Sequence, residues 1–95
     1  MTLRCYEDYT VWQKAMDLAE AVYAVTLKLP FEERFGLSDQ LRRAAVSVPS
    51  NIAEGQARRT DKEFSYFLHI SRGSIAEIDR EVGKMINSLV YKLNI

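Results

Sequence analysis

Basic side chains occur in pairs and short clusters in this sequence. Arg42 and Arg43 are adjacent, and Arg58 and Arg59 form a second pair. Clustered Lys and Arg side chains bind the phosphates of nucleic acids and release counterions, which makes such binding depend on salt. We therefore regard six residues as candidate nucleic-acid contacts, namely Arg42, Arg43, Arg58, Arg59, Lys62 and Arg72.

The charge balance of the whole chain argues against nucleic-acid binding by a monomer. The 95 residues include 13 Lys and Arg and 13 Asp and Glu, so the formal net charge is zero. On a solvated surface the carboxylates of Asp39, Glu54, Asp61 and Glu63 can pair with the same arginines. An oligomer would alter the local balance, because it repeats one arginine cluster around its axis and concentrates a positive field.

Residues that could form a catalytic or metal site are few. His69 is the only histidine and Cys5 the only cysteine, and no Ser, Cys or Thr stands in a nucleophile motif with an evident base. His69 also lacks the Glu-x-x-His spacing of metal-binding helical bundles. Phosphate-cradling glycine loops and dinucleotide fingerprints are absent from the sequence. We expect a protein that is not an enzyme and that uses no cofactor and no metal.

The charged residues that resemble acid and base groups have a structural interpretation. Glu54 and Glu77, with Arg43 and Arg72, are expected to form ion pairs that fix the register of packed helices. A single cysteine cannot form an internal disulfide. The sequence has no apolar run of signal-peptide length at its N-terminus and no stretch of the ~20 apolar residues that a membrane span requires. We therefore expect a cytoplasmic protein with no membrane partner.

The positions of the apolar residues predict an all-α fold in one domain, residues 1–95. Only four glycines and two prolines interrupt the chain, and the period of three and four residues is that of helices. The predicted helices cover residues 9–29, 38–55 and 61–93. The first has its apolar face at Val11, Ala15, Leu18, Val22, Val25 and Leu29. Pro30 is predicted to end it, and residues 31–36 to connect it to the second.

The second helix contains a proline inside its periodic stretch. Ser38 is the predicted N-cap, Gly55 the predicted end, and Pro49 is expected to kink the helix because it removes one backbone hydrogen bond. Short polar side chains beside the proline can bond backbone groups that it leaves unpaired. We interpret five residues as a structural motif, Pro49, Ser50, Asn51, Glu54 and Gly55, and Ser47 belongs beside them. Thr60 and Glu63 then fit a capping box that starts the third helix.

The third helix is predicted to extend beyond the other two. Some 33 residues would reach about 50 Å, whereas the first two helices span about 30 Å each. Its far end would leave an apolar stripe in water, which soluble proteins normally cover with another chain. We expect an oligomer interface there, formed by Met85, Ile86, Leu89, Val90 and Leu93. A break near Gly83 into a short fourth helix is the competing interpretation.

Several segments together resemble a known bacterial family. They are residues 6–8, 11–18, 33–37, 40–55, 58–64 and 72–77, and the string Ser-Val-Pro-Ser-Asn-Ile-Ala-Glu-Gly at 47–55 is the most specific of them. The sequence is similar to the four-helix-bundle proteins encoded in 23S rRNA intervening sequences, a family that includes the accessory protein of diversity-generating retroelements. The resemblance implies an up-and-down four-helix bundle that assembles as a pentamer. It also implies, for the retroelement protein, binding to a reverse transcriptase and to nucleic acid through a basic surface.

The C-terminal region departs from the family pattern. Family members finish the third helix, turn, and run back through a fourth helix whose end resembles residues 81–89, whereas here that ending follows Glu77 almost directly. A real deletion, natural or engineered, would fuse the third and fourth helices and favour an assembly in which subunits exchange their ends. A segment merely left out of the numbering would restore the ordinary bundle and the pentamer.

These observations lead to one functional expectation and one alternative. We expect a non-catalytic, self-associating helical-bundle protein that binds nucleic acid, such as an RNA, or a reverse-transcriptase complex through repeated arginine clusters. The alternative is an oligomeric protein-interaction scaffold with no nucleic-acid partner. The two differ in whether the arginines form one exposed cluster or are paired with carboxylates.

Overall fold

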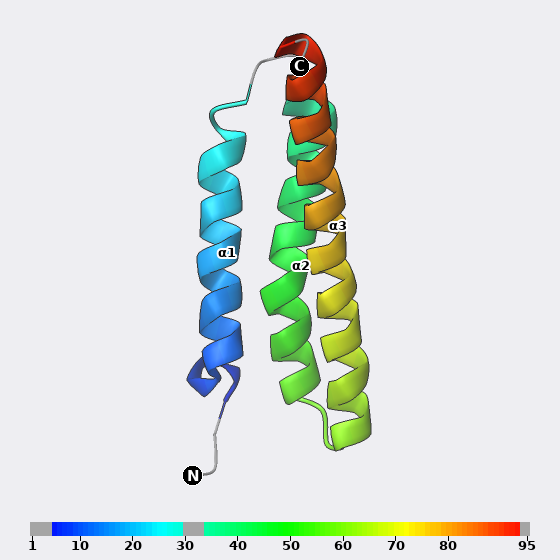
Figure 1. Ribbon diagram of the computed structural model, residues 1–95. Coiled ribbons are helices and arrows are strands. Elements are labelled where there is room, and N and C mark those ends of the chain that lie inside the picture. The colour runs from blue at the N-terminus through cyan, green and yellow to red at the C-terminus, as the bar shows by residue number, and fades with distance from the viewer. Residues whose placement is uncertain (1–4, 30–33, 94–95) are drawn as a thin grey trace.

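The computed structural model describes residues 5–29 and 34–93, and most of these residues are helical, as predicted (Figure 1). A short 3₁₀ turn, η1 (Tyr6–Asp8), precedes α1 (Thr10–Thr26). A π-helical turn, η3 (Arg34–Ser38), leads into α2 (Asp39–Gln56), and α3 (Asp61–Leu93) completes the chain. Within the described ranges no helix combines the length and the apolar content that a bilayer crossing requires.

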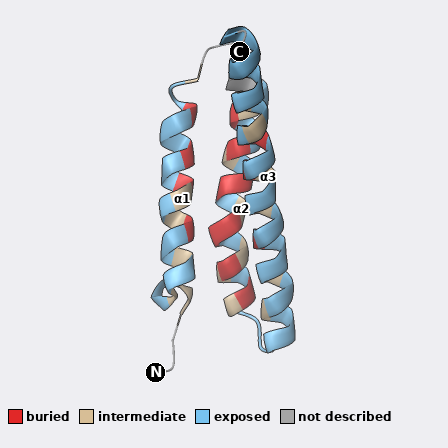
Figure 2. Cartoon of the chain, in the orientation of Figure 1, coloured by how far each residue is buried: buried red, intermediate tan, exposed pale blue. Residues whose placement is uncertain are grey.

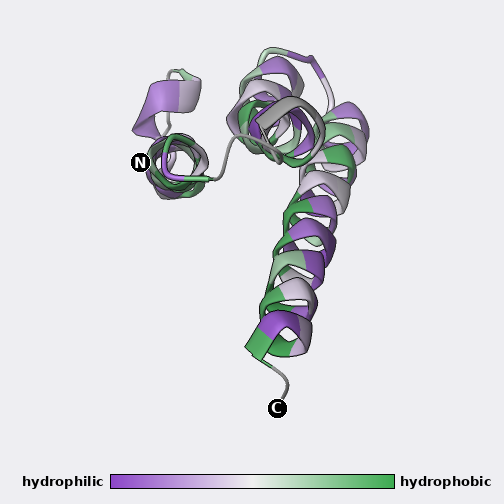
Figure 3. Ribbon diagram, turned by 90° about the horizontal axis from the view of Figure 1, so that it is seen from above, coloured by the Kyte–Doolittle hydropathy of each residue, from purple (hydrophilic) through white to green (hydrophobic). Residues whose placement is uncertain are grey.

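The three long helices form an open arrangement with α2 at its centre. Both α1 and α3 pack against α2, but they make little contact with each other. Viewed from above, α1 and α2 are seen nearly end on, whereas α3 is inclined and its C-terminal end projects away from them (Figure 3). The molecule is elongated, with extents of 53 × 22 × 21 Å. The side of α2 between α1 and α3 is left open by the described residues.

The hydrophobic core is built mainly by α2. Among the described residues, Leu41, Val48 and Ile52 of α2 are each 2% exposed, and burying such a side chain stabilises a fold by about 1.5–3 kcal/mol. Figure 2 shows the buried residues along α2 and on the side of α1 that faces it. In contrast, Ile78 is the only buried hydrophobic residue that α3 contributes. Most of the apolar surface of α3 is thus uncovered by its own chain.

The end of α1 lies three residues earlier than predicted. The helix ends at Thr26, where the Leu27 amide donates to the Tyr23 carbonyl oxygen at 3.2 Å. The Thr26 hydroxyl donates to the same carbonyl at 2.8 Å, and such local bonds compete with helix propagation. Pro30, which was predicted to stop the helix, lies outside the described residues, as do residues 31–33 of the predicted connection.

Two sequence-based predictions about α2 need correction. Ser38 is not an N-cap, because its backbone is already helical (φ −60°, ψ −43°) and its side chain makes no capping bond; η3 continues directly into α2. The helix also continues through Gly55 to Gln56. A Cβ at position 55 would lie 2.7 Å from the Cβ of Phe67, so this glycine is needed for close packing of α2 on α3. The helix continues through Pro49, and the kink stays a prediction.

The third helix is continuous over 33 residues, including Gly73 and Gly83. The break near Gly83 is therefore absent. At its start, the Glu63 amide donates to the Thr60 hydroxyl at 3.2 Å, which is the first half of the predicted capping box. Because α2 has 18 residues and α3 has 33, α3 is about 22 Å longer than the helix it packs against.

Candidate functional site

An apolar groove lies between α1 and α3, and we call it the α1–α3 groove. Its volume is about 330 Å³. Val11, Leu68 and Ile75 on its walls are 51%, 36% and 46% exposed. The complete lining is Val11, Lys14, Ala15 and Leu18 of α1, Val48 and Ile52 of α2, and Leu68, Ser71, Arg72 and Ile75 of α3. Exposed apolar surface of this kind is typical of interaction sites and ligand-binding grooves.

The apolar wall that α3 gives to this groove continues along the helix beyond it. Val82 and Leu89 follow Leu68 and Ile75 at steps of seven residues and are 40% and 57% exposed. Seven residues are close to two helical turns, so these side chains share one face of α3. The groove and the end of α3 therefore form one uncovered apolar surface.

The residues predicted at an oligomer interface fall into two groups. Ile86, Leu89, Val90 and Leu93 are between 40% and 58% exposed. Met85 differs, because it packs against the core of its own chain together with Leu37. Met85 is thus not part of the uncovered surface of α3, whereas Val82, which is 40% exposed, belongs to it.

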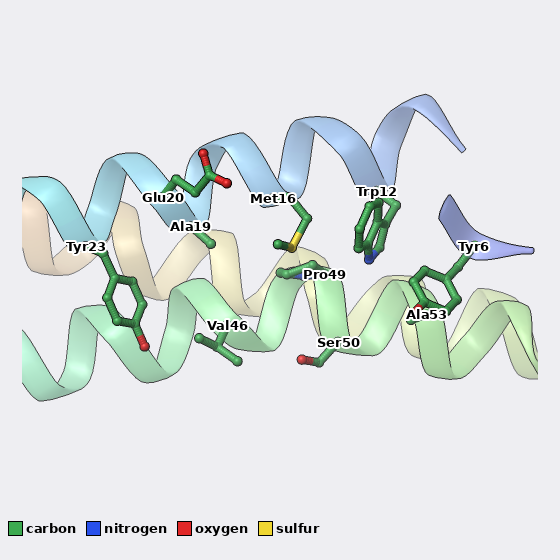
Figure 4. Close-up of a pocket in the computed structure, with 10 residues that line it drawn as sticks. All are labelled: Tyr6, Trp12, Met16, Ala19, Glu20, Tyr23, Val46, Pro49, Ser50 and Ala53. Atoms are coloured by element: carbon green, nitrogen blue, oxygen red, sulfur yellow. The ribbon is translucent and has the colours of Figure 1, made fainter. Parts of the chain in front are cut away.

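A second groove, the α1–α2 groove, is lined by aromatic side chains and has a volume of about 620 Å³. Figure 4 shows Met16 and Trp12 of α1 directed towards Pro49 and Ala53 of α2. The Tyr6 ring meets Trp12 edge on, with ring centroids 5.1 Å apart. Pro49 therefore contributes its ring to this groove in addition to its place in α2.

The polar residues near Pro49 join α2 to α3. The Ser71 hydroxyl donates to the Val48 carbonyl oxygen at 2.9 Å, and the Ser74 hydroxyl donates to Ser47 Oγ at 2.7 Å. The Asn51 amide donates to the Ser47 carbonyl oxygen at 2.8 Å. These bonds satisfy polar groups inside a helix contact, where an unpaired group would cost about 1–3 kcal/mol.

The candidate nucleic-acid residues lie in separate parts of the chain. Arg43 is near Asp39, with 3.9 Å between the charged atoms, and Arg58 pairs with Glu54 one turn earlier. Arg43 lies in the second turn of α2, whereas Arg58 lies two residues beyond its end, so almost the whole length of α2 separates them. Arg72 is elsewhere, in the α1–α3 groove. The described chain brings together Arg58, Arg59 and Lys62 at the connection between α2 and α3, and no ion pair of Arg59 or Lys62 occurs among the described residues.

Arg42 has contacts within its own chain. Its Nε donates to the Thr26 hydroxyl at 2.9 Å, and its guanidinium lies over the Tyr23 ring, 5.1 Å from the centroid. Thr26 itself is 1% exposed. Arg42 therefore links the end of α1 to the start of α2 through a hydrogen bond and a cation–π contact.

The remaining titratable groups were compared with the needs of a metal site. In the part of the chain that the structure describes, no three His, Cys, Asp or Glu residues are placed to hold an ion. His69 is exposed, with Nδ1 2.8 Å from the Ser65 carbonyl oxygen. Glu77 pairs with Arg80 rather than with an arginine of another helix.

Glu81 is a buried carboxylate that the sequence analysis did not single out. Its side chain is 4% exposed and accepts from Lys84 Nζ at 3.2 Å. The Gln40 side-chain amide is oriented so that both its oxygen and its nitrogen have suitable partners. In this orientation the Gln40 nitrogen donates to both Glu81 carboxylate oxygens, at 2.9 and 3.1 Å. The pairing of Gln40 with Glu81 joins the first turn of α2 to α3.

Sequence reasoning also missed the walls of the α1–α3 groove. Val11 and Leu18 were assigned to the one apolar face of the first helix, because they fit the same period as Ala15 and Val22. A signal for this groove is present in the sequence. Trp12, Met16, Ala19 and Tyr23 follow the same spacing one position along, which widens the apolar arc of the first helix and indicates more than one neighbour.

The comparisons with known proteins identify the family. No curated protein matches the chain. The family model of the 23S rRNA-intervening sequence proteins matches residues 7–88. This range includes α1, α2 and all but the last turn of α3, so the chain belongs to the 23S rRNA-intervening sequence protein family.

Proposed function

We propose that this protein is a non-catalytic scaffold that self-associates through the α1–α3 groove and the uncovered end of α3. The observation that carries the proposal is the continuous apolar surface from Leu68 to Leu93, which borders the groove and has no cover in its own chain. A monomer would leave this surface in water, whereas association buries it and gains about 25 cal/mol for each Å² of apolar area.

The chain also needs outside support for its stability. Its third helix contributes only Ile78 to the buried hydrophobic core among the described residues, although it contains 33 residues. Small domains bury a modest fraction of their surface and are correspondingly marginal. Docking of another chain against α3 would supply the packing that the single chain lacks.

The solution mass of the purified protein tests self-association. Light scattering after size exclusion, over a range of concentrations, is expected to show an oligomer, and a mass of five subunits would support a pentameric ring. Ile75→Glu should shift the mass towards the monomer because it places a charge in the groove. Arg43→Glu, on an exposed part of α2, is the matched control and should leave the mass unchanged. A wild-type protein that stays monomeric at every concentration contradicts the proposal.

Nucleic-acid binding is a second candidate function, and one specific observation favours it. Arg59 and Lys62 are exposed beside Arg58, and Tyr66, one turn further along α3, is 63% exposed. Cations beside an exposed aromatic ring can hold a phosphate backbone while a base stacks on the ring. An oligomer would repeat this cluster and add to its field.

Binding of a short single-stranded RNA at several salt concentrations tests this candidate. Wild-type affinity should fall steeply as salt rises, and each phosphate contact that is removed should reduce the salt slope by about 1. The double variant Arg59→Glu and Lys62→Glu is expected to abolish binding, and Lys28→Glu, at an exposed residue outside the candidate set, serves as the control. Salt-independent or undetectable wild-type binding would leave the scaffold without a nucleic-acid partner.

A further inference from the structure

We propose that the α1–α3 groove is filled by residues 82–93 of a second copy of this chain, which we call the C-terminal segment. The exchange is reciprocal, so that each protomer of a dimer supplies the fourth helix of the other. This inference rests on the proposed self-association and adds its occupant and geometry.

The spacing of the apolar residues on α3 fits an antiparallel pairing of two copies. Leu68, Ile75, Val82 and Leu89 lie at successive steps of seven residues and are 36%, 46%, 40% and 57% exposed. In the antiparallel pair, Leu68 lies opposite the partner's Leu89, and Ile75 lies opposite the partner's Val82. The same register places a two-fold axis between Ile78 and Asp79. Each copy then uses one half of the stripe to line its groove and the other half to fill the groove of its partner.

The C-terminal segment cannot reach the groove of its own chain. The helix is unbroken from Asp61 to Leu93, and Ile75 and Leu89 are separated by about 21 Å along it. The inclination of α3 also carries its end away from α1 (Figure 3). A return into the groove would require a turn in α3, and the described helix has none, so the occupant must come from another chain.

The size of the contact matches a stable dimer. Ten residues line the groove, and the C-terminal segment adds twelve residues of α3, which together fall within the roughly 20–30 residues per partner of a standard interface. A pairing through five exposed apolar side chains, Val82, Ile86, Leu89, Val90 and Leu93, is also typical of the apolar centre of homodimer contacts.

The helix dipole favours this orientation, whereas the side-chain charges do not. The segment 82–93 contains Lys84 and Lys92 and no Asp or Glu, and the groove carries Lys14 and Arg72; Lys84 is paired with Glu81 of its own helix. In the antiparallel pair, the C-terminus of the partner's α3 lies at the end of the groove where α1 and α3 begin (Figure 1). A helix C-terminus carries a partial negative charge, so it is attracted to Lys14 on the wall of the groove.

Charge substitutions at opposed positions test the exchange. Leu68→Lys and Leu89→Glu should each raise the dissociation constant of the homo-oligomer by about tenfold or more, because each leaves a charge unpaired in an apolar contact. An equimolar mixture of the two variants should recover association, since one contact then contains the Lys and Glu pair and the other contains two leucines. Tyr91→Glu, at a residue that is 86% exposed, is the control within the same segment and should leave the mass unchanged.

Intermolecular disulfides give a second readout that does not depend on stability. In a Cys5→Ser background, mixed Ile75→Cys and Val82→Cys chains should form a covalent dimer under mild oxidation, whereas Ile75→Cys and Tyr91→Cys chains should not. Association that persists without this cross-link, and that Leu89→Glu does not weaken, would overturn the exchange and leave self-association intact. A wild-type mass of five subunits would overturn the exchange alone, because a reciprocal two-fold exchange closes as a dimer. A wild-type monomer would overturn both proposals.

Discussion

The side chain of Arg42 donates from Nε to the Thr26 hydroxyl across 2.9 Å and at the same time covers the Tyr23 ring. Thr26 is almost completely buried, so this contact closes the end of the α1–α2 interface. The contact shows that adjacent arginines can have different roles, because Arg43 points to solvent with a side chain that is 83% exposed.

Loss of the Arg42 contact is expected to destabilise the protein. Arg42→Ala removes a hydrogen bond and a cation–π contact and should lower the free energy of unfolding by about 1–2 kcal/mol. Arg43→Ala is the matched control and should change it by less than about 0.5 kcal/mol, since exposed ion pairs contribute little. Urea denaturation at one fixed protein concentration measures both values. Equal effects of the two variants would contradict the assigned role of Arg42.

Alanine substitutions at Gly55 and Gly73 are expected to have opposite effects on stability. Gly55→Ala should destabilise the fold by about 1 kcal/mol or more, because the new Cβ would lie 2.7 Å from the Cβ of Phe67 and neither backbone can yield easily. Gly73→Ala should stabilise α3 by up to about 1 kcal/mol through helix propensity alone, since a Cβ there meets nothing within 4 Å. Thermal unfolding at matched concentration distinguishes the signs, and a stabilising Gly55→Ala would refute the close approach.

The buried hydroxyl of Ser71 is expected to contribute to the contact between α2 and α3. It is 4% exposed and donates to the Val48 carbonyl oxygen. Ser71→Ala should lower the free energy of unfolding by about 1 kcal/mol, the usual value of one such bond. Ser65→Ala, on an exposed part of the same helix, should have almost no effect. Denaturant titration of the two variants provides the comparison.

Gln40 and Glu81 are expected to respond unequally to substitution. Gln40→Ala leaves the buried Glu81 carboxylate without its amide donor and should cost about 1–3 kcal/mol. Glu81→Met removes the charge together with its need for donors, and replacement of a buried charged group by an apolar one of similar volume is often neutral or stabilising. Calorimetric or chemical unfolding should therefore rank Gln40→Ala as the less stable variant. The reverse order would mean that Lys84 alone satisfies Glu81.

The sequence predicted the helical content and the extent of α3 because these depend on local spacing. The period of Phe64, Leu68 and Ile75 and the scarcity of glycine and proline are properties of the chain itself. The Thr60 cap is equally local, since it involves two residues within one turn. In contrast, Ser38 and Gly55 were misassigned as a cap and a stop, because their roles depend on η3 and on Phe67, which sequence spacing does not reveal.

The sequence by itself therefore determined that this protein is an all-helical member of its family with an extended apolar third helix. Only the tertiary structure decided which apolar positions are core and which remain uncovered. Val48 of α2 and Ile75 of α3 each fit the apolar period of their own helix, but only Val48 is buried against other helices of the chain. It likewise decided that Arg42 is held by Thr26 while Arg59 stays exposed. These outcomes depend on how α1 and α3 are placed against α2, and that placement comes from contacts between residues that are distant in the sequence.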